Sequence, residues 1–307
     1  MSRVLVIGGN GFVGSYVVDE LVRAGHEVTV FDRFSGAQRF AERPHRVIAG
    51  DFLNVGDLEA AVSGQEIVYH LLSTTTPASA ERDPLLDIRT NVTGSIELFR
   101  IAAETSVQHL YFVSTGGAIY GEQDDVIVDE TALPQPISPY AIGKLAIENY
   151  LAYFERVHGL RSTVLRLSNP YGPRQSPTRK QGVIPIFLRN VSLGMPLTVY
   201  GDGGMERDYI YVEDAARLLT TPQLVGGGEH HVYNVGSGHS HTLDEIIDSI
   251  RRVTGVEPRI EHRPAPSTFV EHIALSTDRF DRDFGAVAPL VDLDEGVRRT
   301  WLAVKGE

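Results

Sequence analysis

The sequence of 307 residues predicts an α/β protein with a doubly wound parallel sheet and a smaller C-terminal α/β cap that binds substrate. Two observations support this fold class. In the first half, short apolar runs that suit buried strands alternate with longer segments of helical periodicity, which is the pattern of repeated strand–helix–strand units. After Asn169 prolines and glycines become frequent over residues 170–204, so a second, less regular region begins there.

The strands expected in the first half are short runs rich in branched apolar and aromatic residues. They cover residues 3–7, 26–31, 46–49, 67–72, 110–114 and 162–167. The expected helices carry apolar residues at helical spacing and cover residues 14–24, 87–104 and 139–158. The first of these helices ends at Gly25, and glycine commonly terminates helices.

The second half is expected to contain fewer regular elements. Helices are predicted near residues 184–193 and at 243–253, and residues 256–307 mix short elements. Strands are predicted at 208–212 and 232–235, and both are expected to return to the parallel sheet.

These elements predict two domains. Residues 1–168 with about 208–236 form the dinucleotide-binding domain, and residues 169–207 with 237–307 form the substrate-binding domain. The second domain is expected to cover the carboxyl ends of the strands, where open α/β sheets bind their ligands.

Composition excludes several classes of function. The formal net charge of −12 provides no field that attracts nucleic acid or an anionic membrane. The chain has no cysteine, which removes disulfides and thiolate catalysis and agrees with a cytoplasmic location. No stretch reaches the roughly 18 apolar residues of a membrane helix, and the first apolar run is a short strand rather than a signal peptide. No metal site is expected, because the histidines of residues 230–241 lack supporting carboxylates.

A glycine-rich turn follows the first strand. Gly8, Gly11 and Gly14 form the pattern G-x-x-G-x-x-G between a strand and a helix. Glycines there allow a tight turn and a close approach of the backbone to a pyrophosphate, and the helix N-terminus offers N–H groups to the phosphates. The turn therefore predicts a Rossmann-type dinucleotide site, although a glycine turn without a ligand has the same pattern.

Two aspartates follow the next strands. Asp32 ends the second strand, 18 residues after Gly14, where an acid accepts hydrogen bonds from the adenine ribose and repels a 2′-phosphate. This position favours NAD over NADP, and the neighbouring Arg33 weakens the preference slightly. Asp51 follows the third strand and suits either the adenine amino group or a solvated turn.

Tyr140 and Lys144 lie four residues apart on a predicted helix, so they share one face. A free tyrosine has a pKa of about 10 and is a poor base at neutral pH. A lysine cation and an oxidised nicotinamide both favour the phenolate, which could then take a proton from a sugar hydroxyl while hydride leaves the same carbon. An ordinary amphipathic pair on a helix has the same spacing.

These motifs together resemble the extended short-chain dehydrogenase/reductase family, and within it the NAD-dependent nucleotide-sugar epimerases. The matching segments span nearly the whole chain: Gly8-Gly-Asn-Gly-Phe-Val-Gly14, Asp32, Gly50-Asp51-Phe-Leu, His70-Leu-Leu-Ser73, Asn91-Val-Thr-Gly94, Ser114-Thr-Gly-Gly-Ala-Ile-Tyr-Gly121, Ser138-Pro-Tyr-Ala-Ile-Gly-Lys144, Arg166-Leu-Ser-Asn-Pro-Tyr-Gly-Pro-Arg174, Arg207-Asp-Tyr-Ile-Tyr-Val212 and Tyr233-Asn-Val-Gly-Ser-Gly238.

The resemblance implies a role for each matching position. Tyr140 is the implied acid/base, and Lys144 binds the nicotinamide ribose and tunes Tyr140. Contacts to NAD are implied for Gly8, Gly11, Phe12, Val13, Gly14, Asp32, Asp51, Phe52, Leu71, Ser73, Asn91, Tyr140 and Lys144. Contacts to the nucleotide sugar are implied for Thr75, Gly116, Asn169, Val183, Tyr200, Arg207 and Arg263. For Arg207 the alternative is a surface arginine paired with Asp208, and for Arg263 the spacing departs from the family pattern.

One position departs from the family. Gly116 occupies the place of the usual catalytic Ser or Thr, so the helper hydroxyl must come from Ser114, Thr115, the segment 73–76 or a water molecule. Thr115 is the preferred candidate, although a strand-end threonine bonded to the backbone explains it equally simply. Related dehydratases carry an Asp-Glu pair where this chain has Gly117 and Ala118, which argues against elimination.

The predicted activity is therefore epimerisation at C4 of a UDP-sugar of the UDP-glucose/UDP-galactose type, through a transient 4-keto sugar. The first alternative is an NADPH-dependent reductase of a 4-keto nucleotide sugar, which Asp32 disfavours. The second is a non-catalytic NAD-binding protein on the same fold, which only Gly116 favours. Helices 87–104 and 139–158 carry extra apolar residues and predict a homodimer, although both could simply pack on the sheet.

Overall fold

The computed structural model describes residues 1–123, 127–176, 182–226, 228–265, 270, 272–287 and 289–306. The chain folds into two compact units. Unit 1 comprises Met1–Thr115, Ser138–Arg166 and Ala216–Tyr233, and unit 2 comprises Gly116–Ile137, Leu167–Ala215 and Asn234–Glu307. The unit boundaries differ from the predicted ones, because residues 116–137, 167–168, 208–215 and 234–236 belong to unit 2.

Unit 1 is built on a seven-stranded sheet with the strand order β11-β7-β5-β4-β1-β2-β3. The strands are β1 (Arg3–Ile7), β2 (Glu27–Asp32), β3 (Arg46–Ala49), β4 (Ile67–His70), β5 (His109–Thr115), β7 (Ser162–Leu167) and β11 (Val232–Val235). The pairings among β1 to β5 are parallel. The order runs outward in both directions from β1 and β4, which confirms the doubly wound sheet.

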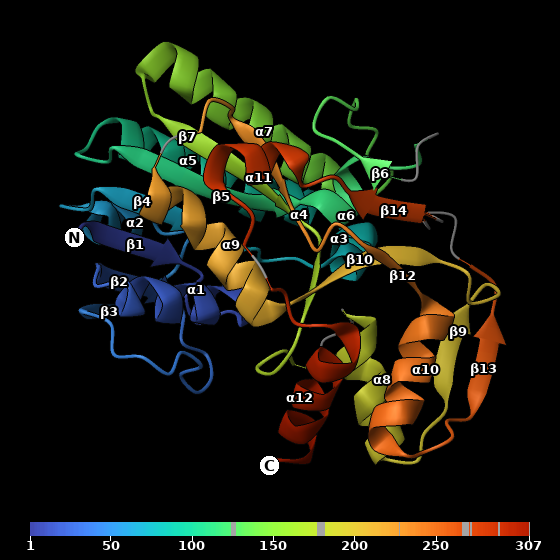
Figure 1. The fold of residues 1–307 in the computed structure, drawn as a ribbon. Coiled ribbons are helices and arrows are strands. Elements are labelled where there is room, and N and C mark those ends of the chain that lie inside the picture. Colours follow the sequence, from blue (N-terminus) through green and yellow to red (C-terminus); the bar gives the residue numbers. More distant parts are fainter. Residues whose placement is uncertain are drawn as a thin grey trace. The chain divides into compact units, whose positions relative to one another are not determined.

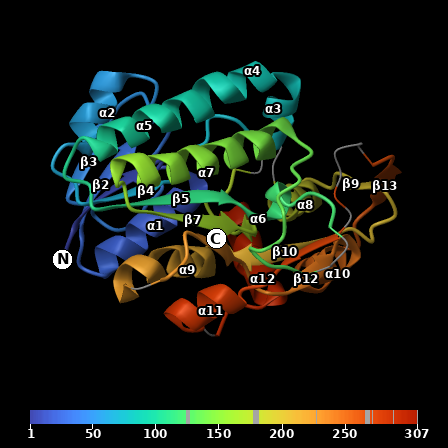
Figure 2. The same ribbon diagram turned by 90° about the horizontal axis from the view of Figure 1, so that it is seen from above.

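Helices cover both faces of this sheet. Figure 2 shows α2 (Val55–Val62), α5 (Thr93–Ala103) and α7 (Pro139–His158) on one face, and α1 (Phe12–Arg23) and α9 (Val212–Val225) on the other. The core of the first face is apolar, and it joins Leu5, Phe31 and Phe112 of the strands to Phe99 of α5 and Leu151 of α7. The helix α9 was not predicted, and Pro222 lies inside it, where a proline argues against a helix.

The predicted helix 87–104 is divided in the structure. After α3 (Pro77–Arg82), the chain forms α4 (Pro84–Asp87), a π-helical turn η1 (Ile88–Val92) and then α5. Asp83 caps α4 by accepting a hydrogen bond from the Leu86 N–H group at 3.0 Å. A π-turn inserts one extra residue per turn, and such turns recur at functional sites. Figure 1 places this part of unit 1 beside α7.

Unit 2 contains two smaller sheets. The five-stranded sheet follows the order β12-β10-β14-β6, with β8 also paired to β10, and β13 pairs with β9. The strands are β6 (Ile127–Val128), β8 (Asn169–Tyr171), β9 (Leu197–Tyr200), β10 (Glu206–Tyr211), β12 (Ser240–Thr242), β13 (Ile260–Arg263) and β14 (His272–Leu275). The predicted return of strand 208–212 to the parallel sheet is wrong, because β8, β12 and β14 supply the hydrogen-bonding partners of β10.

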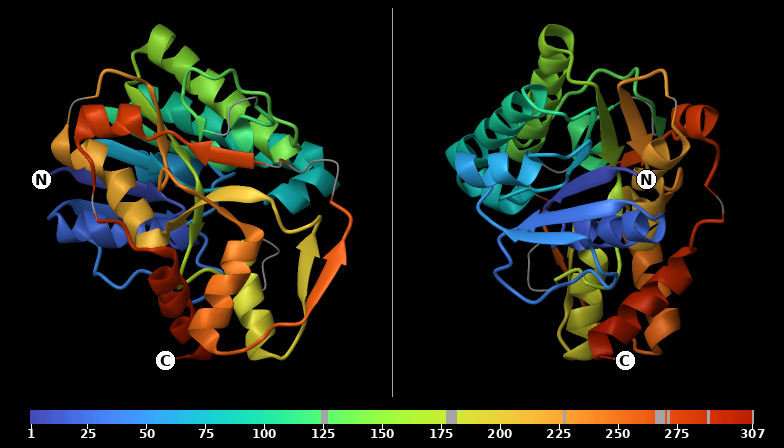
Figure 3. Two further views of the ribbon diagram at one scale, coloured as in Figure 1. Left: turned by 45° about the vertical axis from the view of Figure 1, so that its right-hand side comes forward. Right: turned by 90° about the vertical axis from the view of Figure 1, so that its left-hand side faces the viewer.

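Three helices form the second apolar core of the molecule. Figure 3 shows α8 (Val183–Ser192), α10 (Leu243–Thr254) and α12 (Leu293–Lys305) packed together. Their buried contacts include Phe187 of α8, Ile250 of α10 and Val297 of α12. Unit 2 also contains the short helices α6 (Gly116–Ile119) and α11 (Asp278–Phe284). Within the described ranges of the chain, no helix is long and apolar enough to cross a membrane.

Candidate active site

The glycine turn joins β1 to α1 as a tight cradle. Gly8 has φ +81°, and a Cβ atom at Gly14 would overlap the Gly8 carbonyl oxygen. A Cβ atom at Gly11 would lie 2.9 Å from that same oxygen. No side chain caps α1, so the N–H groups of its first turn, at Phe12 and Val13, remain for a ligand. The cradle therefore fits the pyrophosphate of a dinucleotide.

Asp32 lies beside this turn with a fixed carboxylate. One oxygen accepts a hydrogen bond from the Asn10 N–H group at 3.0 Å, and the other accepts from the Arg33 N–H group at 2.8 Å. The Asn10 side chain in turn accepts from the Arg39 N–H group at 2.8 Å and donates to the Ala37 carbonyl at 3.2 Å. Each carboxylate oxygen keeps a second lone pair for a ribose hydroxyl.

The other predicted cofactor residues follow β3 and β4. Asp51 is exposed, and its carboxylate accepts from the Leu53 N–H group at 3.0 Å, as in an ordinary turn. Phe52 is 3% exposed and packs in the core. Leu71 donates its N–H to the Ile7 carbonyl at 3.0 Å, next to the turn. The Ser73 hydroxyl donates to the Thr75 carbonyl at 2.9 Å. Cofactor contacts from these residues stay predictions.

Local signals in the sequence fix the start of α7 and so the two catalytic candidates. Ser138 accepts a hydrogen bond from the Ala141 N–H group at 3.3 Å, and Pro139 occupies the first helical position. Tyr140 and Lys144 then lie one helical turn apart near the N-terminus of α7.

Lys144 is buried against the end of β5. Its ammonium group donates a hydrogen bond to the Val113 carbonyl at 2.9 Å. The same nitrogen lies 4.6 Å from the centre of the Phe112 ring and 6.0 Å from the centre of the Tyr140 ring. The lysine side chain is therefore oriented by strand β5 and shares its surroundings with Tyr140.

Burial shifts the pKa values of Tyr140 and Lys144 in opposite directions. Desolvation lowers the pKa of Lys144 to about 8, while Asp87 and Glu148 act in the other direction. Desolvation raises the pKa of Tyr140 to about 12, and the charge of Asp87 adds to that rise. Tyr140 alone is thus a neutral phenol at pH 7, and a further positive charge beside it is needed to make it a base.

Two hydroxyl side chains lie at the end of β5. Ser114 is 5% exposed, and its buried hydroxyl has no hydrogen-bond partner within the described chain. Thr115 ends the strand and is half-buried, and Gly116 begins α6. An orphaned buried hydroxyl is costly unless a ligand or water pairs with it. This observation supports Ser114 as a helper hydroxyl in addition to the preferred candidate, Thr115. Both roles remain predictions.

Sequence reasoning missed Asp87, a 2% exposed carboxylate at the end of α4. It accepts hydrogen bonds from the Thr75 hydroxyl and from the Asn91 amide, the latter at 2.8 Å. The predicted substrate residue Thr75 and the predicted cofactor residue Asn91 are thus joined to each other inside unit 1. The spacing Asp87-x-x-x-Asn91 on one helix face was the available signal.

The predicted substrate residues of unit 2 fall into two pairs of neighbouring strands. Asn169 of β8 donates its side-chain amide to the Asp208 carbonyl of β10 at 2.9 Å. Arg207 of β10 is largely buried, which lowers its pKa, and it donates to the Glu206 carbonyl at 2.7 Å and to the Val270 carbonyl. Arg207 is therefore not the surface partner of Asp208 that the alternative interpretation expected.

The second pair consists of Tyr200 and Arg263, which are direct partners in the parallel pairing of β9 and β13. Partners in register place their side chains on the same face of the ribbon. Both are exposed, and Tyr200 is 42% exposed. Val183 begins α8 and is half-buried.

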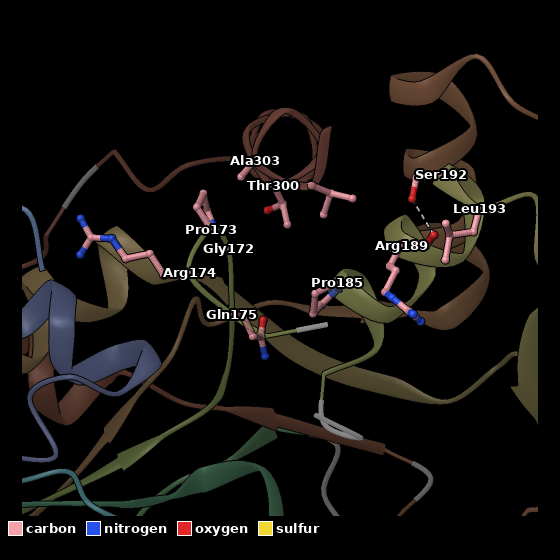
Figure 4. Close-up of a pocket in the computed structure, with 11 residues that line it drawn as sticks. Gly172, Pro173, Arg174, Gln175, Pro185, Arg189, Ser192, Leu193, Thr300 and Ala303 are labelled. Carbon is pink, nitrogen blue, oxygen red and sulfur yellow. Dashed lines mark hydrogen bonds between the residues drawn. The ribbon is translucent and has the colours of Figure 1, made fainter. Parts of the chain in front are cut away.

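A separate pocket of about 360 Å³ in unit 2 contains none of these residues. Figure 4 shows it between α8, α12 and residues 172–175. It is lined largely by apolar groups such as Pro173, Pro185 and Leu193, and the Ser192 hydroxyl at its edge donates to the Arg189 carbonyl at 2.7 Å. In the part of the chain that the structure describes, acidic and histidine side chains form no group of three that could bind a metal ion.

A sequence model of the NAD dependent epimerase/dehydratase family matches residues 4–236 of the chain. The chain belongs to this family. Its cofactor is NAD, and the glycine cradle and the fixed carboxylate of Asp32 fit that group.

The relatives of this family member include enzymes of different activity. It is 30% identical to a UDP-glucose 4-epimerase from Mycolicibacterium smegmatis, with 97% of each chain covered. It is also 30% identical to a dTDP-4-dehydro-6-deoxyglucose reductase from Escherichia coli, with 98% of this chain and 97% of that one covered.

Solved structures of nucleotide-sugar epimerases are also similar to this chain. A UDP-glucose 4-epimerase from Thermotoga maritima, crystallised with UDP-glucose, matches with a TM-score of 0.91 at 35% identity. A UDP-glucose 4-epimerase from Thermus thermophilus, in complex with NAD, matches with a TM-score of 0.91 at 34% identity. Each comparison covers 99% of both chains. This chain is therefore an enzyme of the nucleotide-sugar epimerase and dehydratase type with the expected Rossmann-type fold.

Proposed function

We propose that this enzyme interconverts the C4 epimers of a UDP-sugar, of the UDP-glucose and UDP-galactose type, through a transient 4-keto sugar. One observation carries the proposal. The proton-transfer residue Tyr140 lies one turn from the buried Lys144, and the segment 116–118 after β5 offers no second acid or base. Epimerisation needs one proton-transfer group, whereas removal of water needs two.

The chain's own residues divide the work. NAD, when bound, supplies a reversible hydride acceptor at C4 of the sugar. Tyr140 takes the proton of the 4-hydroxyl group and later returns it to the same oxygen. Lys144 orients the ribose of the cofactor and favours the phenolate through its charge. Ser114 or Thr115 donates a hydrogen bond to the sugar oxygen. The small side chains of residues 116–118 leave room for the keto sugar to turn.

The nucleotide is proposed to bind to unit 2. Arg207 offers a largely buried guanidinium fork for the diphosphate, and Asn169 lies on the strand paired to it. Val183 and Tyr200 would enclose the uracil and its ribose, with Arg263 next to Tyr200 as a second diphosphate ligand. The Thermotoga maritima neighbour, whose structure contains UDP-glucose, supports this nucleotide.

The test is a product assay. Purified enzyme is incubated with UDP-glucose or UDP-galactose, and the sugar is identified after hydrolysis of the nucleotide. We expect each substrate to approach the same equilibrium mixture without added NAD, because the cofactor is regenerated in every cycle. Absence of turnover with every UDP-sugar that carries a free 4-hydroxyl group would refute the proposal.

A second candidate is an NADPH-dependent reductase of a 4-keto nucleotide sugar, because the E. coli reductase is as similar as the mycobacterial epimerase. The fixed carboxylate of Asp32 disfavours the 2′-phosphate of NADPH. An assay with a 4-keto sugar nucleotide and each reduced cofactor separates the two. Stoichiometric oxidation of NADPH would favour the reductase.

We also propose a homodimer, formed by the helices α4–η1–α5 and α7. Several of the apolar residues that predicted it, such as Phe99 and Leu151, lie in the core of unit 1 instead. The apolar side chains left exposed on these helices are Leu85, Leu86, Ile88, Ile142, Tyr150, Tyr153 and Val157. Light scattering should give twice the 33.7 kDa of one chain, and a monomer would refute this. A cytoplasmic location is proposed from the absence of cysteine alone.

A further inference from the structure

A buried carboxylate that the mechanism above does not use lies beside the catalytic helix. Asp87 is 2% exposed, and one of its oxygens accepts hydrogen bonds from the Thr75 hydroxyl and the Asn91 amide. The Asn91 amide also donates to the Thr75 hydroxyl at 2.8 Å, and its oxygen accepts from the Thr74 N–H group at 2.8 Å. Neutral donors thus fix the position of this carboxylate.

The other oxygen of Asp87 lies against α7. A Cβ atom built on Gly143 would overlap Asp87 Oδ2. The carboxylate cannot turn away easily, because Thr75 and Asn91 bind its first oxygen. A side chain at position 143, which directly precedes Lys144 and lies three residues after Tyr140, would therefore have to displace this carboxylate. The negative charge therefore lies against the backbone of the catalytic turn.

Asp87 carries no matching positive charge from an arginine, because it forms no ion pair within the described chain. The second acid near Lys144, Glu148 of α7, is bound by Arg166 of β7 at 2.7 and 3.2 Å. The Glu148 carboxylate therefore has a cationic partner of its own.

The remaining ionisable groups around Lys144 are neutral. His70 of β4 is fully buried, and desolvation and the Lys144 charge lower its pKa to about 3. Tyr140 is a phenol at neutral pH, because its pKa is raised to about 12. Strand β5 contributes only the Phe112 ring and the Val113 carbonyl. Asp87 and Glu148 both favour the charged form of Lys144, and within the described chain Glu148 is paired with an arginine whereas Asp87 is not.

We propose that Asp87 is a positioning residue of the active site, whose carboxylate, fixed by Thr75, Asn91 and Gly143, is the counter-charge of the Lys144 ammonium group. The inference rests on the proposed function, in which Lys144 must be charged to assist Tyr140. The same anion favours the proton on both residues. Asp87 therefore sets the pH range in which Lys144 is an ammonium group and Tyr140 can still lose its proton.

The first experiment measures Lys144 directly. The chain contains three lysines, Lys144, Lys180 and Lys305, so lysine labelled with carbon-13 at Cε gives a simple spectrum, in which Lys144→Arg assigns the signal. In the NAD-loaded enzyme, Asp87→Asn should lower the titration midpoint of Lys144 by about one pH unit or more. The matched control is Asp19→Asn, because Asp19 is equally buried in unit 1 but binds the N–H groups of Ala41 and Glu42. It should leave the midpoint unchanged.

An unchanged midpoint in folded Asp87→Asn enzyme would overturn the proposal. If that variant does not fold, Gly143→Ala provides the same test, because its methyl group displaces the carboxylate without removing it. A midpoint unaffected by this substitution would equally overturn the proposal.

The second experiment is the pH profile of kcat. Asp87→Asn should move both the acidic and the basic limb of the profile to lower pH. The variant should therefore be less active than wild type at pH 8 and should recover part of that activity at pH 6.5. A purely structural role would lower the whole profile without moving it. Wild-type enzyme that is inactive on every UDP-sugar, together with a shifted Lys144 midpoint, would refute the proposed function and leave the role of Asp87 standing.

Discussion

The two units hold their candidate site residues in different ways. In unit 1 the side chains of Lys144, Asp87 and Asn91 are all less than 10% exposed, and hydrogen bonds at 2.8–2.9 Å fix each of them. In unit 2 Tyr200 and Arg263 stand on an exposed two-stranded ribbon. The comparison indicates that the candidate reacting groups are held in place within unit 1, whereas the proposed nucleotide contacts of Tyr200 and Arg263 lie on an exposed ribbon.

The largest effect is expected at the centre of unit 1. Tyr140→Phe removes the proton-transfer group and should lower kcat by about 10²–10⁴-fold. The glycine cradle is untouched, so NAD should still be released in stoichiometric amount when the variant is denatured. Activity close to wild type in this variant would contradict both the mechanism and the assignment of the reacting group to unit 1.

A smaller effect is expected from Arg207, the largely buried cation of unit 2. Arg207→Lys keeps the charge but loses the planar fork, at a cost of about 1.5–3 kcal/mol. We expect KM for the UDP-sugar to rise roughly 10- to 100-fold with a lesser change in kcat. A fall in kcat at constant KM would place Arg207 with the reacting groups and would blur the contrast between the units.

The stability of unit 1 should depend on pH through His70. Its folded pKa of about 3 lies below the unfolded value of about 6.5, so the unfolded chain binds the proton first as the pH falls. The free energy of unfolding should therefore decrease by about 1.4 kcal/mol per pH unit between about pH 6 and pH 4 from this group. Denaturant titrations of wild type and His70→Gln should differ by that slope. Equal slopes would mean that His70 has the same pKa in the folded and the unfolded chain.

The smallest effect is expected on the exposed ribbon. Arg263→Ala removes a solvated charge next to Tyr200, and surface charges contribute about 0–1 kcal/mol. KM should rise no more than about fivefold, and the effect should shrink in roughly 0.5 M salt, which screens exposed charges. A loss as large as that of Arg207→Lys would show that the ribbon contributes to nucleotide binding as strongly as β10 does.

Local signals explain why much of unit 1 was predictable. Ser138, Pro139 and Gly159 mark both ends of α7, and the predicted range 139–158 matches the structure. The dinucleotide turn was equally legible, because its glycines are needed by the backbone itself.

Features that depend on partners distant in the sequence were not predictable. The sequence of residues 206–211 does not indicate that β10 pairs with β8, β12 and β14 rather than with a strand of the parallel sheet. The helix α12 was also missed, although Asp292 caps its N-terminus. Asp87 acquires its importance only when α4 packs against α7 and places Gly143 beside it.

The carboxylate of Asp32 is fastened by two backbone amides, those of Asn10 and Arg33, at the point where the glycine turn meets β2. A carboxylate without such hydrogen bonds could rotate away from a phosphorylated ribose. The Asp32 carboxylate is held by the backbone of the turn. A change of preference from NAD to NADP would therefore require redesign of residues 33–39 together with position 32. Substitution of Asp32 alone should destabilise the turn without creating a site for the 2′-phosphate.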